Sequence, residues 1–359
     1  MALFKFGSKN KLGIDIGTAS IKIVELSKES GRFKLENYGL FELKSDNINT
    51  GDQGVTDQDL IWGIKQTLDL GKFKTRDAVV SIPLFNTFAT VITMPFLSEQ
   101  DIAKTIPYEA RKYIPLPLSE VVLDWSIINV VQQNPGQTAQ ASQGTAPKGT
   151  SVEVFIVAVP KDQIEHYQTI TKQIGLNTKA LELENTAMIR AIVGNDLSPV
   201  AIINIGGRST SILVVDNGFE RVSLNYEVGG FEITKSIARS LNVSLKRAEE
   251  LKRSMGLRNA NSDMITSAMS SLVDLIAFEA KKTIHNYEDL KKTKIANILL
   301  VGGLANMPMF IEYFADKLGL PISSGNPLAR VVYPSQLEPL KMELNSTFAI
   351  ALGLAMREV

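Results

Sequence analysis

Two glycine-containing segments, half a chain apart, carry residue types that bind phosphate. Gly13–Val24 reads GIDIGTASIKIV, and Ile203–Val214 reads INIGGRSTSILV. Each alternates apolar residues on both sides of a short turn, a pattern typical of a β-hairpin. A glycine turn with small hydroxyl residues leaves backbone N–H groups open to an anion. Two such tips facing each other across a cleft would clamp a polyphosphate.

The first segment adds two charged side chains. Asp15 lies just before the turn, where a carboxylate can hold a hydrated Mg²⁺, and Lys22 can reach a phosphate as a point charge. One copy alone is explained more simply as a plain hairpin. Laying Asp15 on Asn204 gives an offset of 204 − 15 = 189 residues in a chain of 359, and this repeat favours the clamp.

A third glycine motif follows both hairpins. Ile298–Phe314 reads ILLVGGLANMPMFIEYF and predicts a buried strand, a Gly-Gly turn, and a helix that opens near Asn306 and Pro308. The glycines would let a base or ribose lie against the backbone, and the helix N-terminus would favour phosphate. Alone this motif is weak, because many α/β proteins contain it. The sequence has no G-x-x-x-x-G-K-[ST] motif, which excludes a standard P-loop.

Composition excludes several other classes. The chain has 38 Lys and Arg against 38 Asp and Glu, so it lacks the overall positive charge that nucleic-acid binding normally uses. It has no Cys and only two His, which excludes disulfides, thiolate chemistry and a multi-histidine metal centre. No apolar run approaches the roughly 18 residues of a membrane span, and no signal peptide is evident. We therefore expect a cytoplasmic protein of two domains or lobes.

Short β-rich runs alternate with longer helical patterns, which indicates an α/β fold. The predicted strands are Leu12–Ile16, Ile21–Leu26, Ala78–Pro83, Val152–Pro160, Val200–Ile205, Ser211–Val215 and Ile298–Val301. The predicted helices are Ser98–Ile114, Lys161–Ile174, Gly230–Leu241, Lys246–Met255, Ser271–Leu290 and Met307–Lys317. Residues 132–150 offer almost nothing to bury and predict a disordered surface loop.

The order hairpin, hairpin, Gly-Gly turn resembles the phosphate-1, phosphate-2 and adenosine motifs of the actin-like ATPase superfamily. Within it, the sequence is most similar to the PilM family of type IV pilus assembly, in the FtsA/PilM branch. The resemblance covers nearly the whole chain. It rests on KLGIDIGTASIKIVEL, LSEQDIAKTIPYEARKYIPLPLSEVVLDW, IINIGGRSTSILVVDNG, RAEELK and FAIALGLAMRE. It implies an α/β, bilobal actin-like fold with duplicated ribonuclease-H-like lobes and an inserted FtsA/PilM-type subdomain.

The resemblance also implies a nucleotide site for ATP and Mg²⁺. Asp15 would hold the metal through water and act in catalysis, and Glu184 would position the attacking water. The implied nucleotide-binding residues are Gly17, Thr18, Ala19, Ser20, Lys22, Asn204, Gly206, Gly207, Ser209, Thr210, Ser211, Glu249, Lys252, Gly302, Gly303, Leu304 and Asn306. Glu249 and Lys252 lie on one helix face and are equally explained as a surface ion pair. Glu184, like Glu182, is also explained as the end of a solvated strand.

The sequence departs from the family pattern in the second hairpin. Asn204 stands where relatives carry Asp, so the site keeps a hydrogen-bonding group but loses a charge that helps hold the metal. Arg208 stands in the turn where a small residue is usual, and either pairs with phosphate or points into solvent. We expect nucleotide binding with weak or absent ATP hydrolysis.

The resemblance implies the following organisation. Residues 1–93 and 176–199 form lobe I, 94–175 the inserted subdomain, 200–340 lobe II with a helical subdomain at about 226–295, and 341–359 a C-terminal helix on lobe I. The implied function is a cytoplasmic scaffold in the assembly of a type IV pilus, or of a related secretion or DNA-uptake machine. It would bind the N-terminal tail of a PilN-like inner-membrane protein through the inserted subdomain. Contact with the pilus assembly ATPases is also implied, contact with the membrane comes only through the partner, and a homo-oligomer is left open.

Two other functions remain compatible with the sequence. A small-molecule kinase of the same superfamily would need a carboxylate base in the cleft, for which Asp124 and Asp216 are the candidates. An FtsA-like polymerising ATPase would share the same nucleotide motifs.

Overall fold

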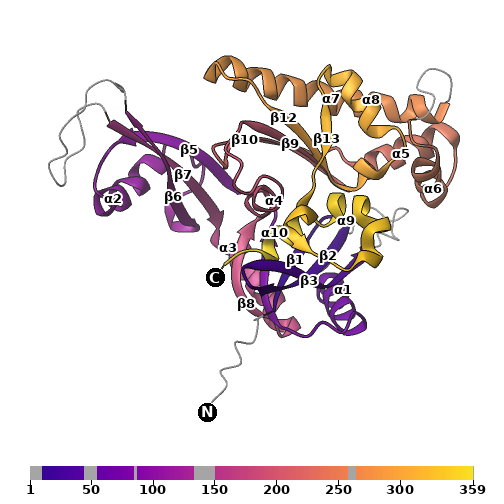
Figure 1. The fold of residues 1–359 in the computed structure, drawn as a ribbon, viewed down its shortest axis with the longest axis horizontal. Coiled ribbons are helices and arrows are strands. Elements are labelled where there is room, and N and C mark those ends of the chain that lie inside the picture. Colours follow the sequence, from indigo (N-terminus) through magenta and orange to yellow (C-terminus); the bar gives the residue numbers. More distant parts are fainter. Residues whose placement is uncertain (1–9, 44–54, 85–86, 133–149, 258–263, 359) are drawn as a thin grey trace, which may run out of the picture.

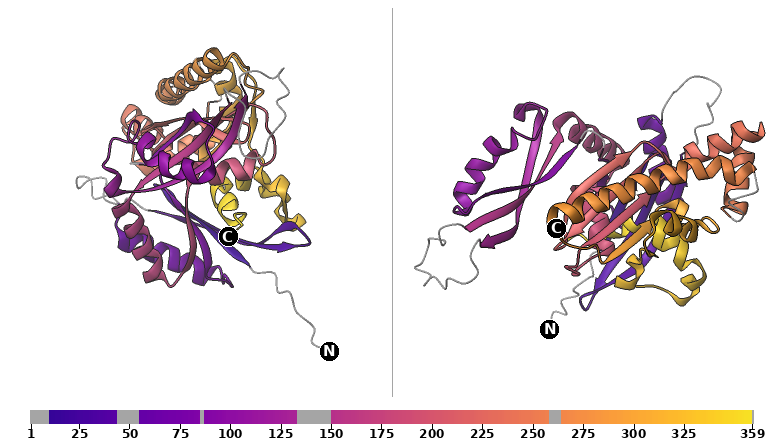
Figure 2. Two further views of the ribbon diagram at one scale, coloured as in Figure 1. Left: turned by 90° about the vertical axis from the view of Figure 1, so that its left-hand side faces the viewer. Right: turned by 90° about the horizontal axis from the view of Figure 1, so that it is seen from above.

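The computed structural model describes residues 10–43, 55–84, 87–132, 150–257 and 264–358. Two sheet-and-helix lobes pack together, and a small third sheet projects from them as an arm (Figures 1 and 2). Within the described residues, no helix combines the length and apolar character needed to cross a bilayer.

Lobe I is built on a six-stranded sheet in the order β14-β3-β2-β1-β4-β8. Its strands are β1 (Lys11–Ile16), β2 (Ser20–Glu29), β3 (Arg32–Glu42), β4 (Asp77–Ile82), β8 (Asn177–Leu183) and β14 (Val331–Val332). Alternate residues of β1, such as Leu12 and Ile14, pack under α1 (Asp57–Leu70) and α3 (Lys161–Ile174). The intervening Gly13 faces α10 (Ala349–Ala355), where a Cβ would lie 1.9 Å from the carbonyl oxygen of Ala351. Only glycine permits this approach.

Lobe II repeats the same topology in the order β11-β10-β9-β12-β13. Its strands are β9 (Val200–Ile205), β10 (Thr210–Asp216), β11 (Phe219–Tyr226), β12 (Asn297–Val301) and β13 (Ile322–Ser324). In both lobes, three antiparallel strands are followed by two that run parallel to the first. One face carries the helices α5 (Gly230–Leu241), α6 (Leu245–Met255), α7 (Met264–Lys291) and α8 (Phe310–Leu318). The predicted duplicated α/β fold is confirmed.

Helices α4 (Glu184–Ile192) and α10 lie between the two sheets and join the lobes. Their apolar residues share one core with the inner faces of β9, β10 and β4. A Cβ on Gly353 would lie 1.8 Å from the carbonyl oxygen of Ala187, so the two helix backbones touch. The segment formed by α9 (Lys341–Thr347) and α10 therefore packs on lobe I while it also closes the interface with lobe II.

The arm is a three-stranded antiparallel sheet in the order β5-β7-β6, covered by one helix. Its elements are β5 (Phe88–Pro95), α2 (Glu99–Ala110), β6 (Val121–Gln132) and β7 (Thr150–Pro160). The predicted bounds 94–175 need correction, because the sheet begins at Phe88 and α3 packs in the lobe I core instead. Of the predicted loop 132–150, only the end residues are described, and they pair with each other at the ends of β6 and β7.

A buried ion pair ties the arm to lobe II. Arg221 on β11 places its Nη1 2.8 Å from Oε2 of Glu153 on β7, and both side chains are largely buried. Burial opposes ionisation of Glu153, but Asn129 and Arg221 outweigh it and lower the pKa of that carboxyl. Removing one partner of such a buried pair typically lowers the free energy of unfolding by about 3–5 kcal/mol, so this pair holds the arm in one position on lobe II.

Two predicted helix starts differ from the structure by more than one residue. Helix α7 begins at Met264 rather than Ser271. Helix α8 begins at Phe310 rather than near Pro308, after a 3₁₀ turn at Gly303–Asn306. The reason is that Met309 adopts a left-handed conformation with φ of 60°, while the Pro308 carbonyl accepts a bond from Leu257 outside the helix. The α8 N-terminus therefore does not follow the Gly-Gly turn directly.

Candidate functional site

The two glycine hairpins have the same backbone geometry. In the first, the Gly17 amide donates to the Ser20 carbonyl over 3.1 Å, and in the second the Gly206 amide donates to the Ser209 carbonyl over 2.9 Å. The flanking strands pair in matching register, Ile16 with Ile21 and Ile205 with Thr210. The sequence repeat is thus a structural repeat at each residue of the turn.

The hairpin tips meet across the lobe interface. A Cβ on Gly207 would lie only 2.3 Å from the Cβ of Ala19, so the second tip can approach the first only as glycine. The amides of Thr18, Ala19, Gly207 and Arg208 have no hydrogen-bond acceptor among the described residues. Four amide groups at the touching tips are therefore unbonded and available to donate to an anion.

Asp15 is held in place by two neighbours. Its carboxylate is buried, and Oδ2 lies 3.1 Å from Nζ of Lys22, its cross-strand partner. Ser81 on β4 accepts a bond from the Ile16 amide at 2.9 Å and donates to Asp15 Oδ1 at 3.5 Å. Sequence reasoning missed Ser81, although a single hydroxyl inside the buried run of β4 was a usable signal.

Glu182 and Glu184, two residues apart, have different surroundings. Glu182 is buried and pairs with Arg190 and Arg357, which gives it a structural role. Glu184 opens α4, and part of its side chain remains accessible. Desolvation by the surrounding protein and the nearby Asp15 carboxylate raise the pKa of Glu184 to about 8. The structure therefore places Glu184 near Asp15, whereas Glu182 is occupied by its two arginine partners.

The N-terminus of α5 supports the second tip from behind. The Gly230 amide donates to the Gly206 carbonyl over 3.0 Å, and the Phe231 amide donates to Gly207 over 2.7 Å. The predicted binding residue Thr210 is fully buried, and its hydroxyl donates to the Val228 carbonyl. Thr210 therefore fixes the segment that leads into α5 and does not direct its hydroxyl into the cleft.

Lys252 is buried and Glu249 is partly buried, so the two do not form an ordinary surface ion pair. Lys252 Nζ lies 2.6 Å from Glu249 Oε2 and donates to the Gly230 carbonyl and the Thr234 hydroxyl, which uses all three of its N–H groups. Burial lowers the pKa of Lys252, and the Glu249 carboxylate opposes that shift. Lys252 anchors α5 against the second tip.

The third glycine motif lies beside the second hairpin. Gly302 has φ of 93°, and a Cβ there would lie 2.2 Å from the Ile205 carbonyl oxygen. Gly303 is exposed and has no atom near its Cβ position, which leaves open space for a flat ring. Leu304 packs into the lobe II core, and the Asn306 amide donates to the Ser346 hydroxyl. Of the two glycines, Gly303 is the one whose Cβ position faces open space.

The remaining predicted residues divide between the cleft and other places. Asn204 and Ser211 face each other across β9 and β10 at the register position that Asp15 and Lys22 occupy in lobe I. Arg208 lies with its guanidinium 5.4 Å from the centroid of the Phe231 ring. The kinase candidates lie elsewhere. Asp216 is at the far end of β10, about 20 Å from the tip, and bonds Tyr287, while Asp124 is on the arm.

The arrangement fits a polyphosphate with a weakly held metal. Among the described residues, no group of three or more His, Cys, Asp or Glu side chains could hold a metal ion. Mg²⁺ commonly keeps several waters and is held by one or two carboxylates together with substrate phosphates. Asp15 supplies one such carboxylate beside the free tip amides, and the glycine at position 303 leaves room for a base.

Comparison with known proteins identifies relatives of the chain. The family model of type IV pilus assembly protein PilM matches residues 13–359. Cell division protein FtsA of Neisseria meningitidis serogroup B is 23% identical over 256 residues, covering 64% of this chain and 61% of that protein. FtsA of Enterococcus hirae is 22% identical over 347 residues, covering 87% and 77%.

Solved structures share the fold. A chain of the PilM-PilN type IV pilus biogenesis complex superposes with a TM-score of 0.79 at 22% identity, covering 98% of each chain. Ethanolamine utilization protein EutJ of Carboxydothermus hydrogenoformans superposes with a TM-score of 0.56 at 17% identity, covering 97% of this chain and 89% of that one. These matches show the actin-like ATPase fold.

Proposed function

The chain belongs to the type IV pilus assembly protein PilM family, and on that basis we propose that it is an ATP-binding scaffold of the inner-membrane platform. It binds ATP with Mg²⁺ between the lobes and the cytoplasmic tail of a PilN-like membrane protein at the arm. It is held at the membrane through that partner. If the chain were only a distant actin-like relative without a pilus function, we would expect the shared fold but no match to the PilM family model.

The observation that carries nucleotide binding is the contact between the two hairpin tips. Ala19 and Gly207 lie in contact, so the unbonded amides of both tips are close enough to serve one anion in this proposal. An anion there bonds to both lobes at once, so its binding stabilises their closed arrangement. Lys22 adds a positive charge next to the first tip, and Gly303 leaves room for the base.

Hydrolysis is expected to be weak for two reasons. The second hairpin offers the neutral Asn204 where a second carboxylate would help hold the metal and orient water. Glu184, the candidate water-positioning group, is largely protonated at neutral pH because its pKa is about 8. Bound Mg²⁺ would supply charge neutralisation for the phosphates, while the chain's own contribution is to bind and orient them.

The arm is the part of the molecule suited to a partner. It projects from both lobes in Figures 1 and 2, and among the described strands its edge strand β5 pairs with β7 alone. The solved relative with the TM-score of 0.79 is a PilM-PilN complex. By analogy, a PilN-like tail would add to a strand edge or fill a groove of the arm.

Calorimetric titration of the full chain with ATP tests nucleotide binding. We expect saturable binding that requires Mg²⁺ and falls at least tenfold in Asp15→Ala. Asp289→Ala removes an exposed carboxylate on α7 and should bind as the wild type does. Absence of Mg²⁺-dependent ATP binding at millimolar nucleotide would contradict the proposal. A second titration, with a synthetic peptide of the tail of the organism's own PilN protein, tests the partner.

A further inference from the structure

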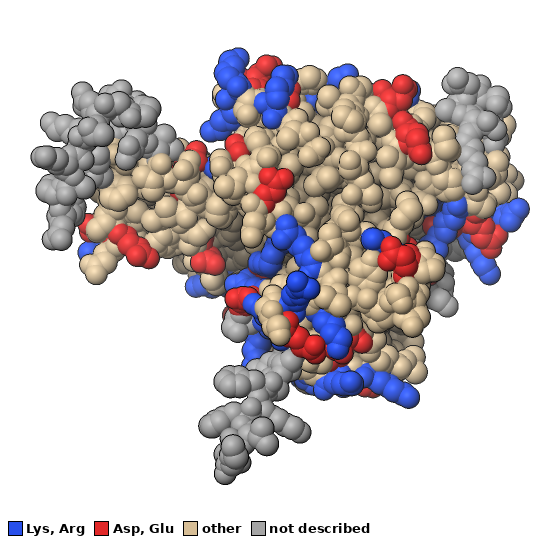
Figure 3. All heavy atoms as spheres, in the orientation of Figure 1, with Lys and Arg blue, Asp and Glu red and all other residues tan. Residues whose placement is uncertain are grey.

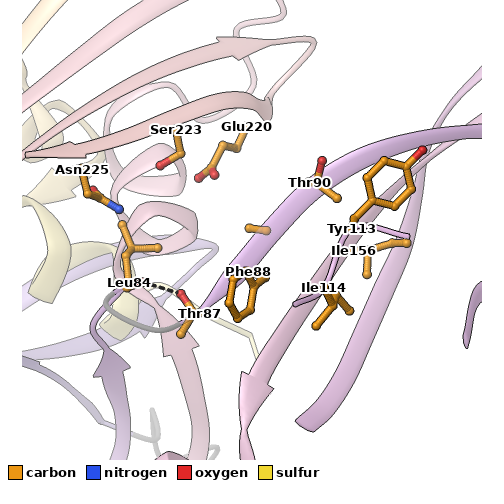
Figure 4. A pocket seen from close by; sticks show the side chains of 11 residues that line it. Leu84, Thr87, Phe88, Thr90, Tyr113, Ile114, Ile156, Glu220, Ser223 and Asn225 are labelled. Carbon is orange, nitrogen blue, oxygen red and sulfur yellow. Dashed lines mark hydrogen bonds between the residues drawn. The ribbon is translucent and has the colours of Figure 1, made fainter. Parts of the chain in front are cut away.

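A pocket of about 280 Å³ lies where the arm meets lobe II and the end of β4. In Figure 4, Glu220 and Ser223 of β11 form one side, and Phe88 and Thr90 of β5 with Tyr113 form the other. The pocket runs along β11 from Glu220, which pairs with Val215 at the far end of β10, to Asn225, which pairs with Ser211 near the second tip. The nucleotide site leaves this pocket unexplained.

The pocket contains a carboxylate that lacks a cation. Glu220 is 6% exposed, and its Oε2 accepts a bond from the Asn185 amide over 2.7 Å. Among the described residues no Lys, Arg or His pairs with it, and Oε1 has no hydrogen-bond partner. Burial raises the pKa of Glu220 to about 7, and the Asn185 bond opposes that rise. A buried carboxylate gains most from a ligand that brings a positive charge.

The walls suit a long, flexible cation. Phe88, Ile114 and Ile156 provide an apolar lining, and Tyr113 stands half-exposed at the mouth. Lys and Arg side chains bury an aliphatic stem along such surfaces while the charged end finds an anion. An aromatic ring beside the path also favours a cation. The combination of apolar walls and a terminal carboxylate matches one basic side chain.

The surrounding charge points the same way. The described residues of the arm, 88–132 and 150–160, contain six acidic and three basic residues, a net charge of 3 − 6 = −3. The acidic residues are Glu99, Asp101, Glu109, Glu120, Asp124 and Glu153, and the basic ones are Lys104, Arg111 and Lys112. Figure 3 shows acidic side chains on the arm, while both signs are interspersed over the lobes. Cytoplasmic segments next to membrane spans carry an excess of Lys and Arg.

We propose that this pocket binds one Lys or Arg side chain of the partner's cytoplasmic tail, with its charged group paired to Glu220. This inference rests on the proposed function, since it specifies how the tail is recognised. Glu220 selects the charge, the apolar walls hold the stem, and the net charge of the arm attracts the basic segment. The pocket thereby fixes the register of the tail between the arm and lobe II.

Glu220→Gln tests the charge pair and preserves the shape. The glutamine oxygen can still accept the Asn185 bond, so the thermal unfolding temperature should change little. We expect the PilN tail peptide to bind at least tenfold more weakly to this variant. Glu120→Gln removes an exposed carboxylate of the same arm and should weaken binding less than threefold. If both variants weaken binding equally, only general charge matters and the pocket proposal is wrong.

Replacing each Lys and Arg of the peptide by Met identifies the side chain that is bound. We expect one replacement to cause a tenfold loss with the wild type and no further loss with Glu220→Gln, which is the signature of a direct pair. Full additivity for each replacement would overturn the pairing. If the peptide binds the wild type and Glu220→Gln with equal affinity, this inference alone is contradicted. If the peptide does not bind at all, the proposed partner is contradicted as well.

The absence of Cys provides a second readout. Thr90→Cys places a unique thiol on the pocket wall, where a maleimide can reach it. The tail peptide should slow labelling at least fivefold, and the peptide with its basic residue replaced by Met should not. Equal protection by both peptides would contradict the proposal. Protection by spermidine with none by the tail would show a small-cation site and would also overturn it.

Discussion

The two glycine hairpins share a backbone and differ in charge. At the same register position, lobe I pairs Asp15 with Lys22 and lobe II pairs Asn204 with Ser211. The turn hydrogen bonds differ by only 0.2 Å, 3.1 against 2.9 Å. The difference teaches that both copies keep the turn geometry, while only the first keeps a carboxylate and its lysine partner at this register position.

The two tips are also supported by different neighbours. The first is backed by side chains, Ser81 beneath Asp15 and Glu184 from α4. The second is backed by backbone, because the α5 amides bond the carbonyls of Gly206 and Gly207. The first tip therefore has ionisable groups beneath it, whereas the second is fixed by backbone hydrogen bonds from α5.

The largest difference in ATP affinity is expected between variants of Asp15 and of Asn204, which occupy matching positions in the two hairpins. Asp15→Asn should weaken Mg²⁺-dependent ATP binding by about 100-fold, close to 2.7 kcal/mol, because the carboxylate assigned to the metal is lost. Asn204→Ala should weaken it by less than about threefold. Calorimetric titration of both variants measures the difference. Equal losses would show that the two hairpins contribute alike.

Gly207→Ala should separate the tips. Its new methyl group would lie 2.3 Å from the Cβ of Ala19, so the lobes must move apart and ATP binding should fall about 30-fold. Ala19→Gly removes the opposing atom, and the double variant should recover most of the affinity. Failure of Ala19→Gly to rescue would place the defect within the second turn itself.

Asn204→Asp should make the second hairpin resemble the first. A second carboxylate at the tips would hold the metal and water better, so steady-state phosphate release should rise about tenfold above the wild-type rate. Phosphate release with Mg²⁺ and with EDTA measures this effect. An unchanged rate in a variant that still binds ATP would show that the lost charge does not limit hydrolysis.

Glu184 should give lobe I a distinct pH dependence. Its pKa in the folded protein, about 8, lies above the ordinary value of 4.5, so the folded state binds this proton more tightly than the unfolded state does. Its contribution to stability is complete below about pH 4.5 and is lost as the pH rises to about 8. Compared with Glu184→Gln, the wild type should lose about 1–2 kcal/mol between pH 5 and pH 9. Parallel thermal unfolding curves for the two proteins would contradict this.

The smallest effect is expected at the exposed edge of the cleft. Arg253 on lobe II lies 3.4 Å from Glu42 on lobe I, but the side chains are 68% and 66% exposed. Glu42→Gln should therefore change the free energy of unfolding by less than about 0.5 kcal/mol. A larger loss in denaturant titrations would mean that this surface pair holds the lobes together.

Several elements could be predicted because their signals are local. The alternation of β1 and β2, their glycine turn and the repeat in β9 and β10 all follow from neighbouring residues. The limits of the arm could not be predicted, because the sequence of α3 predicts an amphipathic helix but does not show whether it packs on the arm or on lobe I. The start of α8 was missed because it depends on the bond from Leu257 to Pro308, made by a distant segment.

The site shows the same division. The sequence identified Asp15 and both turns, but not Ser81, Asn185 or Glu220, whose roles depend on partners 35 or more residues away. The family resemblance singled out Glu184, but the sequence alone explained Glu182 and Glu184 equally well as the end of a solvated strand. Only packing distinguishes them, by giving Glu182 two arginines and leaving Glu184 beside Asp15.

By itself, the sequence determined the two hairpins, their duplication and the neutral residue at position 204, because turn chemistry and side-chain charge are properties of short segments. The tertiary structure decided that the tips touch and that all N–H groups of Lys252 bond to other protein groups. It also decided that Glu220 faces a pocket in which no described cationic side chain pairs with it. Contact, burial and pKa depend on which distant segments share a low-dielectric space, and that is fixed only when the lobes and the arm pack together.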